Sequence, residues 1–192
     1  PCEPPHLKRK SVYSDSDLSA LASRCDALFV THLHGDHLSN RLMREFLDLG
    51  KPVVTPALPM QYDPETKMLS PRFVTDTNLI VLDETHIEPR KIAGIDVRNF
   101  LGNQGKGTPC NIYQLDIDGT VVVHNGDNYD RAQEALLAQC PPADVIIASC
   151  WNDMASLVGN ASRANGFDTA RAILIPAHEN ELGHAVGHRE SY

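Results

Sequence analysis

The chain has 192 residues, of which 42% are hydrophobic and 22% charged, the composition of an ordinary globular protein with one substantial core. Its net charge of −8 argues against a nucleic-acid backbone as the main partner, and no apolar stretch is long enough to span a membrane. The five cysteines contain no Cys-x-x-Cys pair, so we expect reduced thiols and favour a reducing, cytoplasmic location.

The first half of the chain alternates between helix and strand signals. Ser14-Asp15-Ser16-Asp17 supplies candidate caps for a first helix, Ser39 or Asn40 can cap a second, and Gly50 is a natural helix stop. Short apolar runs between these signals predict buried strands. In chain order we expect an irregular arm at residues 1–12, a helix at 14–24, a strand at 27–32, a helix at 39–50, a strand at 52–56 and mostly loop at 57–70.

Strands dominate the second half. We expect strands at residues 78–82, 92–100, 110–117 and 120–124, a helix at 129–139, a strand at 144–149, a partly helical stretch at 152–172 and a last strand at 172–177. Asp118-Gly119 is expected to form a hairpin turn. Because strands alternate with helices and hairpins, the sequence predicts a single layered α/β domain over residues 1–192.

The most informative segment is Thr-His-Leu-His-Gly-Asp-His-Leu at residues 31–38. Side chains alternate along a strand, so His32 and His34 are expected to point the same way. Gly35 permits a turn that brings Asp36 and His37 toward the same space. Neutral imidazole and carboxylate oxygen are ligands that zinc and similar divalent ions prefer. The segment therefore predicts a metal site at the end of one strand.

The run His32-Leu33-His34-Gly35-Asp36-His37 resembles the signature of the metallo-β-lactamase-fold hydrolases. The resemblance implies an αββα sandwich that holds one or two metal ions between its sheets. It also implies that His32 and His34 bind one metal and that Asp36 and His37 bind the other. Family members usually place more strands before this motif, so we expect either a sandwich that lacks N-terminal strands or a trimmed chain.

Two later positions match the family's pattern. The apolar strand at 120–124 leads to Gly126-Asp127, and the resemblance assigns the bridging carboxylate to Asp127. The strand at 172–177 leads to His178, which the resemblance makes the last ligand of the second site. His124 is left out, because neighbours on a strand face opposite sides of the sheet.

One family ligand is missing. Residues 97–110, where the third histidine of the first site should lie, contain no His, and Asn103 stands about where it is expected. An amide oxygen is a poor zinc ligand beside imidazole. Asn103 is therefore a substitute ligand of low affinity, and Cys110 is an alternative thiolate at a less suitable spacing. We expect the second site to be the better occupied.

These features predict a hydrolase in which one or two Zn²⁺ ions activate a water against an ester, lactone, amide or phosphodiester, with Asp36 as the catalytic carboxylate. Mn²⁺, Fe²⁺ or Ni²⁺ are alternative metals. Two other functions stay open: an iron-dependent redox member of the fold that is similar to the persulfide dioxygenases, and a degenerate module that binds metal without catalysis.

The partners are less defined. We expect a small-molecule substrate that loops near residues 57–72 and 151–168 would select, no membrane, and no nucleic acid. A free sheet edge would favour a homodimer. Because the chain begins at Pro1, a leader could have been removed, so a secreted or periplasmic location stays an alternative.

Overall fold

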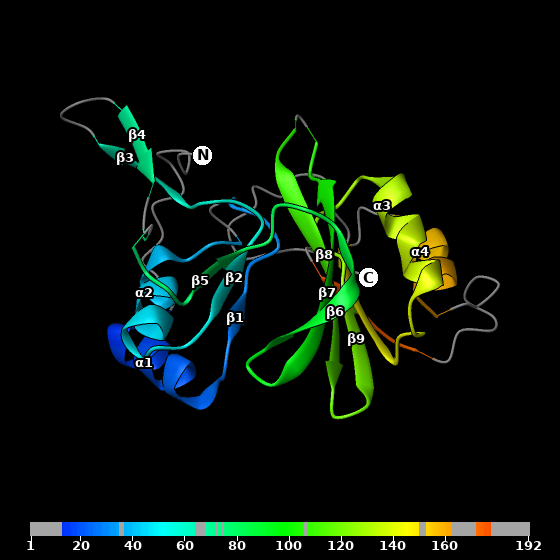
Figure 1. Ribbon diagram of the computed structural model, residues 1–192, viewed down its shortest axis with the longest axis horizontal. Coiled ribbons are helices and arrows are strands. Elements are labelled where there is room, and N and C mark those ends of the chain that lie inside the picture. Colours follow the sequence, from blue (N-terminus) through cyan, green and yellow to red (C-terminus); the bar gives the residue numbers. More distant parts are fainter. Residues whose placement is uncertain are drawn as a thin grey trace.

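The computed structural model describes residues 13–34, 37–63, 68–71, 73, 75–105, 107–149, 153–162 and 172–177. Its elements stack in layers (Figure 1). Helices α1 (Asp15–Arg24) and α2 (Asn40–Asp48) cover a small sheet, which packs against a larger one. Helices α3 (Arg131–Ala135) and α4 (Met154–Ser162) cover the far face of the larger sheet. The predicted layered α/β class, in the order αββα, is confirmed.

The small sheet is parallel throughout and has the order β1-β2-β5. Its strands are β1 (Leu28–Phe29), β2 (Val53–Thr55) and β5 (Leu79–Val81). A separate antiparallel hairpin of β3 (Met60–Asp63) and β4 (Met68–Pro71) lies between β2 and β5 in the chain.

The large sheet has the order β11-β10-β9-β8-β7-β6. Its strands are β6 (His86–Ile92), β7 (Ile95–Asn103), β8 (Pro109–Ile117), β9 (Thr120–His124), β10 (Val145–Ser149) and β11 (Ile173–Ala177). The first four pair antiparallel, whereas β9, β10 and β11 pair parallel. Helix α3 and the 3₁₀ turn η2 (Leu136–Gln139) therefore form part of a crossover between β9 and β10.

Alternation along the strands builds the cores between these layers. Val53 packs with the residues of α1 and α2, whereas its neighbour Val54 faces the large sheet. On β8, Tyr113 faces the small sheet and Ile112 packs toward η2 and α4. This is the two-residue period of a strand buried on both faces. Because both sheets are packed on both sides, the ends of their strands are held in a defined relation.

Buried polar contacts join the two sheets where β1 ends. The Tyr113 hydroxyl donates to the carbonyl of Val30 at 3.0 Å, and the backbone N–H of Asn111 donates to the carbonyl of Thr31 at 2.8 Å. The side chain of Asn111 donates to the carbonyl of Leu82 at 2.9 Å. Buried backbone carbonyls need such partners, and these partners set the path of the segment that enters the histidine motif.

Several predicted elements are confirmed by their local signals. Ser14 caps α1 in a capping box with Asp17, and Ser39 caps α2. Asp118 and Gly119 form the β8–β9 turn with φ of 51° and 85°. The expected strand at 27–32 is shorter than predicted, since β1 has two residues.

Two predictions are wrong. The stretch 57–70, expected to be mostly loop, contains β3 and part of β4. The strand expected at 92–100 corresponds to β7, which begins at Ile95, and β6 before it was not predicted. A turn at Ala93 and Gly94, with φ of 50° and 83°, separates the two strands. Two-residue turns with positive φ usually have Asn, Asp or Gly at both positions, and alanine rarely adopts positive φ. In this turn only the second residue, Gly94, is of the expected type. No helix among the described residues has the length and apolar character that crossing a membrane requires.

Candidate metal centre

His32 follows β1 and is completely buried. Its Nε2 lies 3.2 Å from Nδ1 of His34 and 3.8 Å from Oδ2 of Asp127. Its other ring nitrogen, Nδ1, lies 3.3 Å from the Thr31 hydroxyl and 3.9 Å from the Cys110 thiol. Thr31 and Cys110 therefore hold the ring at Nδ1, while Nε2 faces the other site residues. Such support is what orients a histidine ligand.

His37 enters the same space through a turn. The backbone N–H groups of His37 and Leu38 both donate to the carbonyl of His34, at 3.0 and 2.9 Å. The turn places the His37 ring 4.1 Å from the His32 ring, centroid to centroid. His37 Nε2 then lies 3.3 Å from Oδ2 of Asp127. Gly35 and Asp36, which the motif places in this turn, lie outside the described residues.

Asp127 comes from the other sheet, on the turn that follows β9. Gly126 before it has φ of 53°, and an added Cβ there would lie 2.7 Å from Cβ of Thr31 and 3.0 Å from the Cys110 sulfur. Only glycine allows this turn to approach the His32 segment so closely. The glycine therefore lets the carboxylate from the large sheet reach the imidazoles that follow β1 of the small sheet.

The ligand atoms of His32, His37 and Asp127 all lie within 4.8 Å of one another. Two imidazole nitrogens and one carboxylate oxygen, largely shielded from water, are a donor set that suits zinc and related divalent ions. His34 lies beside this group, in contact with His32. The donor set fits a divalent cation, and further ligands would complete its coordination.

The remaining predicted residues divide into two groups. Asp36 and His178 lie outside the described residues, so their roles stay predictions. Asn103 ends β7, and its side chain contacts its surroundings at both ends: Oδ1 accepts from the Gly105 N–H at 3.1 Å and Nδ2 lies 3.5 Å from Oδ2 of Asp130. Its role as a metal ligand stays a prediction.

His124 belongs near the site, although the sequence argument left it out. It lies opposite Tyr113 in the register of β8 and β9, on the face toward the small sheet. Burial and, to a smaller extent, the proximity of His37 lower the pKa of His124 to about 4, against the opposing effect of Asp127. Its Nδ1 accepts a hydrogen bond from the Gly126 N–H at 3.0 Å. The alternation rule holds along the strand, but the Gly126 turn returns Asp127 to the face that His124 occupies.

Cys110 contacts the site from the side opposite the ligand atoms. Its sulfur approaches His32 through Nδ1, not through the nitrogen that faces Asp127. Burial raises the pKa of the Cys110 thiol to about 12. The cysteine therefore packs as a neutral thiol behind the ring of His32.

No family model and no curated protein matches the sequence. Solved structures are similar to it, among them the metallo-β-lactamase fold protein YhfI from Bacillus subtilis, at 18% identity and a TM-score of 0.44 over 67% of this chain and 51% of that one. The chain is similar to a solved metallo-β-lactamase fold protein. A mutant of the CmlA beta-hydroxylase matches at 16% identity and a TM-score of 0.45, over 72% of this chain and 29% of that one.

A diphosphatase from the PhnP family matches at 14% identity and a TM-score of 0.43, over 83% of this chain and 72% of that one. The chain thus spans about half of YhfI and less than a third of CmlA. The case for a metal centre depends on the side chains of this chain and their distances.

Proposed function

We propose that this protein is a metal-dependent hydrolase of the metallo-β-lactamase fold that acts on a small-molecule ester, lactone, amide or phosphodiester. The observation that carries the proposal is the convergence of His32, His37 and Asp127 from two sheets to within 4.8 Å. Two imidazoles and a carboxylate that share one largely buried space form the ligand set that a divalent cation prefers. Zn²⁺ is the metal we propose, because its preferred ligands are the types assembled here.

The residues have separate roles in this proposal. His32, His37 and Asp127 would hold an ion, with His34, Asp36 and His178 as the remaining proposed ligands of one or two ions. A divalent ion bound there supplies a water of lowered pKa and a positive charge that polarises the bond under attack. Thr31 and Cys110 keep the His32 ring in place through Nδ1. We assign to Asp36 the orientation of the attacking water and the acceptance of its proton.

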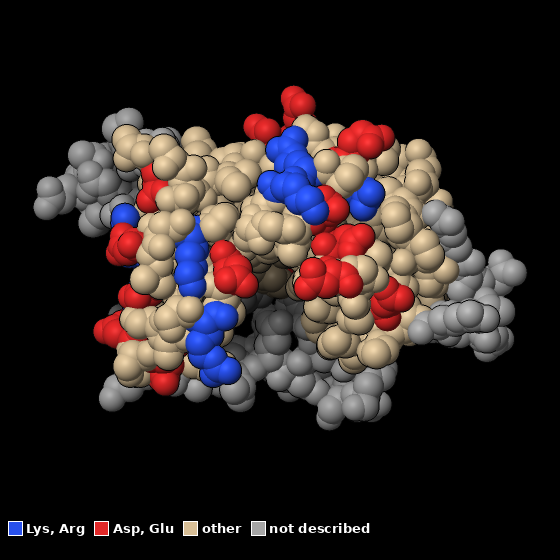
Figure 2. Space-filling view, turned by 60° about the horizontal axis from the view of Figure 1, so that its bottom comes forward, with Lys and Arg blue, Asp and Glu red and all other residues tan. Residues whose placement is uncertain are grey.

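The surface charge supports a small substrate more than a nucleic acid. The chain carries 25 acidic and 17 basic residues. On the face that Figure 2 shows, Lys and Arg side chains lie interspersed with Asp and Glu side chains. A nucleic-acid backbone is usually bound by a continuous basic surface.

Metal analysis tests the proposal directly. We expect the protein to contain a stoichiometric divalent metal after purification, to lose it to a chelator and to recover it from Zn²⁺. His37→Ala should lower the metal content, whereas His86→Ala on β6 should leave it unchanged, which controls for loss of a histidine as such. A wild-type protein with neither bound metal nor uptake from solution overturns the proposal.

Activity assays then separate the reaction classes. We expect the metal-loaded protein to hydrolyse at least one member of a panel of esters, lactones, amides and phosphodiesters, and the stripped protein to hydrolyse none. Bound iron with oxygen consumption on a persulfide would identify a redox enzyme instead. Tight zinc binding with no turnover across the panel would identify a binding module.

We also propose that the protein forms a homodimer through a sheet edge. Among the described strands, β1 lies at one edge of the small sheet and β11 at one edge of the large sheet. On β11, Ile173 is 64% exposed and Ile175 is 44% exposed. Unprotected edges with apolar side chains favour strand pairing between copies. Light scattering of the full chain should give twice the monomer mass, and a monomer at high concentration would contradict this.

A further inference from the structure

The turn that carries Asp127 is held by the next side chain, Asn128, which is 1% exposed. Its Oδ1 accepts from the backbone N–H of Asn103 at 3.2 Å and from that of Asp130 at 3.1 Å. Its Nδ2 donates to the carbonyl of Asp130 at 3.1 Å. One buried amide therefore connects the end of β7 to the segment between Asp127 and α3.

Asn103 completes this connection from the β7 side. Its carbonyl accepts from the Tyr129 N–H at 2.8 Å, and its side-chain Nδ2 lies 3.5 Å from Oδ2 of Asp130. Asp130 in turn caps α3, because its Oδ1 accepts from the N–H groups of Ala132 and Gln133. The residue that stands in the place of the missing histidine is thus bonded to the segment that follows Asp127.

Gly102 on β7 leaves the space that the side chain of Asn128 occupies. A Cβ added at Gly102 would lie 1.9 Å from Oδ1 and 2.9 Å from Cγ of Asn128. Since the glycine has no side chain, the amide can lie directly over the strand. Any larger residue would displace it.

We propose that Asn128 is a positioning residue for Asp127, and that Asn103 braces the same turn instead of binding the first-site metal. The inference rests on the metal centre proposed above. A carboxylate ligand on a free turn loses conformational entropy when it binds, and a turn already ordered by its hydrogen bonds avoids this loss. Partners that fix a ligand in this way commonly change metal affinity by about 10- to 100-fold.

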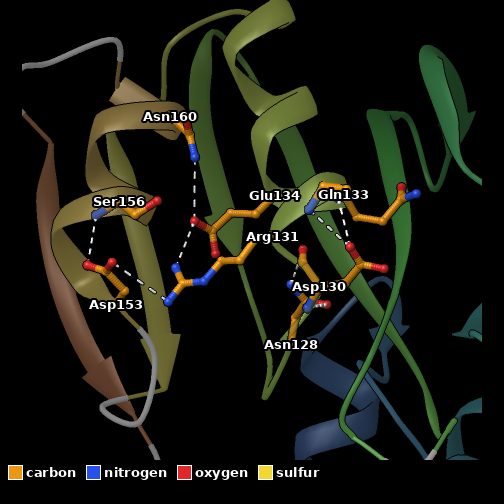
Figure 3. Close-up of polar contacts among 9 residues, drawn as sticks. Asn128, Asp130, Arg131, Gln133, Glu134, Asp153, Ser156 and Asn160 are labelled. Atoms are coloured by element: carbon orange, nitrogen blue, oxygen red, sulfur yellow. Dashed lines mark hydrogen bonds and ion pairs between the residues drawn. The ribbon is translucent and has the colours of Figure 1, made fainter.

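The contact between α3 and α4 offers a matched control variant. Figure 3 shows Asn128 and Asp130 where α3 begins, and Arg131, Glu134 and Asn160 where α3 meets α4. Asn160 Nδ2 lies 3.5 Å from Oε1 of Glu134, so it joins α3 to α4 without contacting the Asp127 turn. Asn160→Ala thus removes the same chemical group as Asn128→Ala, from the other end of the segment.

The first experiment compares these two variants by titration with Co²⁺ and Zn²⁺. We expect Asn128→Ala to lower metal affinity by about 10- to 100-fold and to change the visible spectrum of the Co²⁺ complex. Asn160→Ala should leave both unchanged. Equal affinities for wild type and Asn128→Ala would overturn the proposal.

Asn103→Asp separates a brace from a ligand by the sign of its effect. If Asn103 bound metal, a carboxylate in its place would be the better ligand and affinity would rise. As a brace, the new carboxylate loses the donor to Asp130 and places like charges side by side, so affinity should fall. A rise in affinity would overturn this part of the inference.

Gly102→Ala tests the same contact without altering either asparagine. We expect it to lower metal affinity in the wild type but to add little in an Asn128→Ala background, because the displaced group is then already absent. Fully additive effects would contradict the role of Asn128. This variant also provides the test if Asn128→Ala does not fold.

A measurement without metal distinguishes failure of this inference from failure of the proposed function. In the metal-free protein, backbone hydrogen exchange across residues 125–130 should be faster in Asn128→Ala than in wild type and Asn160→Ala. A wild type that takes up no metal but shows this difference would refute the metal centre alone. Unchanged exchange together with unchanged affinity would refute the brace alone.

Discussion

The two regions that form the candidate centre are held in place by different means. The Asp127 turn is stabilised mostly by near neighbours in the sequence, since Asn128 bonds to Asp130 and Asp130 caps α3. The His32–His37 segment is held mainly from another sheet, through the bonds of Asn111 and Tyr113 to the backbone of residues 30 and 31. The first region is ordered largely by bonds within its own stretch of sequence, with Asn103 as its link to β7, whereas the second depends on hydrogen bonds from the large sheet.

This difference predicts how each region responds to change. Substitutions in the Asp127 turn should act on metal binding first, because the turn is a short unit with its own hydrogen bonds. Substitutions of Asn111 or Tyr113, which hold the His32 segment, should act on metal binding and global stability together, because the same contacts join the two sheets. Four substitutions test this difference between the two regions.

The largest effect is expected from removing the group on which both regions converge. Oδ2 of Asp127 lies 3.3 Å from His37 and 3.8 Å from His32. Asp127→Ala should therefore lower metal affinity by more than about 100-fold, beyond the range of residues that only support ligands. Calorimetric titration with Zn²⁺ measures this, and an unchanged affinity would remove Asp127 from the centre.

The close approach of the two regions is tested at Gly126. Gly126→Ala combines a positive φ with contacts that are too short against Thr31 and Cys110, and should cost about 2–4 kcal/mol of unfolding free energy. Gly119→Ala is a matched control, because Gly119 has φ of 85° but nothing within 4 Å of an added Cβ. Urea unfolding of both variants isolates the cost of contact, and equal losses would show that contact contributes nothing.

A smaller effect on stability is expected from Tyr113, which bonds to the backbone just before His32. Tyr113→Phe removes the hydroxyl that donates to Val30 and accepts from Asn111, at a cost of about 1–2 kcal/mol. Tyr129→Phe, at a tyrosine that is 49% exposed, is the control. We expect Tyr113→Phe to weaken both stability and metal binding. A loss of stability with full metal affinity would contradict the dependence of the His32 segment on the sheet contact.

The smallest effect concerns the anchor of α3 to α4. Burial raises the pKa of Glu134 above its ordinary value of 4.5, against the lowering effects of Arg131, Ser156 and Asn160. The folded state then holds this proton where the unfolded state has released it, so stability should fall as pH rises upward from 4.5 through the raised pKa. Glu134→Gln should lack this contribution. Urea midpoints measured across that pH range test it, and identical slopes in both proteins would contradict it.

Much of the fold and part of the centre could be predicted from local patterns. Ser14 and Asp17 mark the start of α1, and Asp118-Gly119 marks a hairpin turn, because these residues bond or bend within a few positions of themselves. The histidine motif indicated a metal centre because its spacing suits one strand and one turn. Asp127 joined that prediction through its resemblance to a known pattern, and the structure brings it to His32 and His37.

Other features could not be read from the chain alone. The turn at Ala93-Gly94 has a weak signal, so the strand expected at 92–100 runs through it, and β6 was not predicted. His124 was left out because strand alternation was applied without the reversal that follows at Gly126. Nothing near Asn103 in the sequence shows that its amide contacts Asp130. Each of these depends on what the chain meets after it has turned or paired.

The types of ligand, the caps and turns, and the alternation that buries both sheets can be read from the amino-acid sequence, because they follow from interactions over a few residues. It is the packing of the two sheets that brings His32 and Asp127 into one space and that requires a glycine at position 126. Such distances depend on how two packed layers are placed against each other, which no short stretch of sequence encodes.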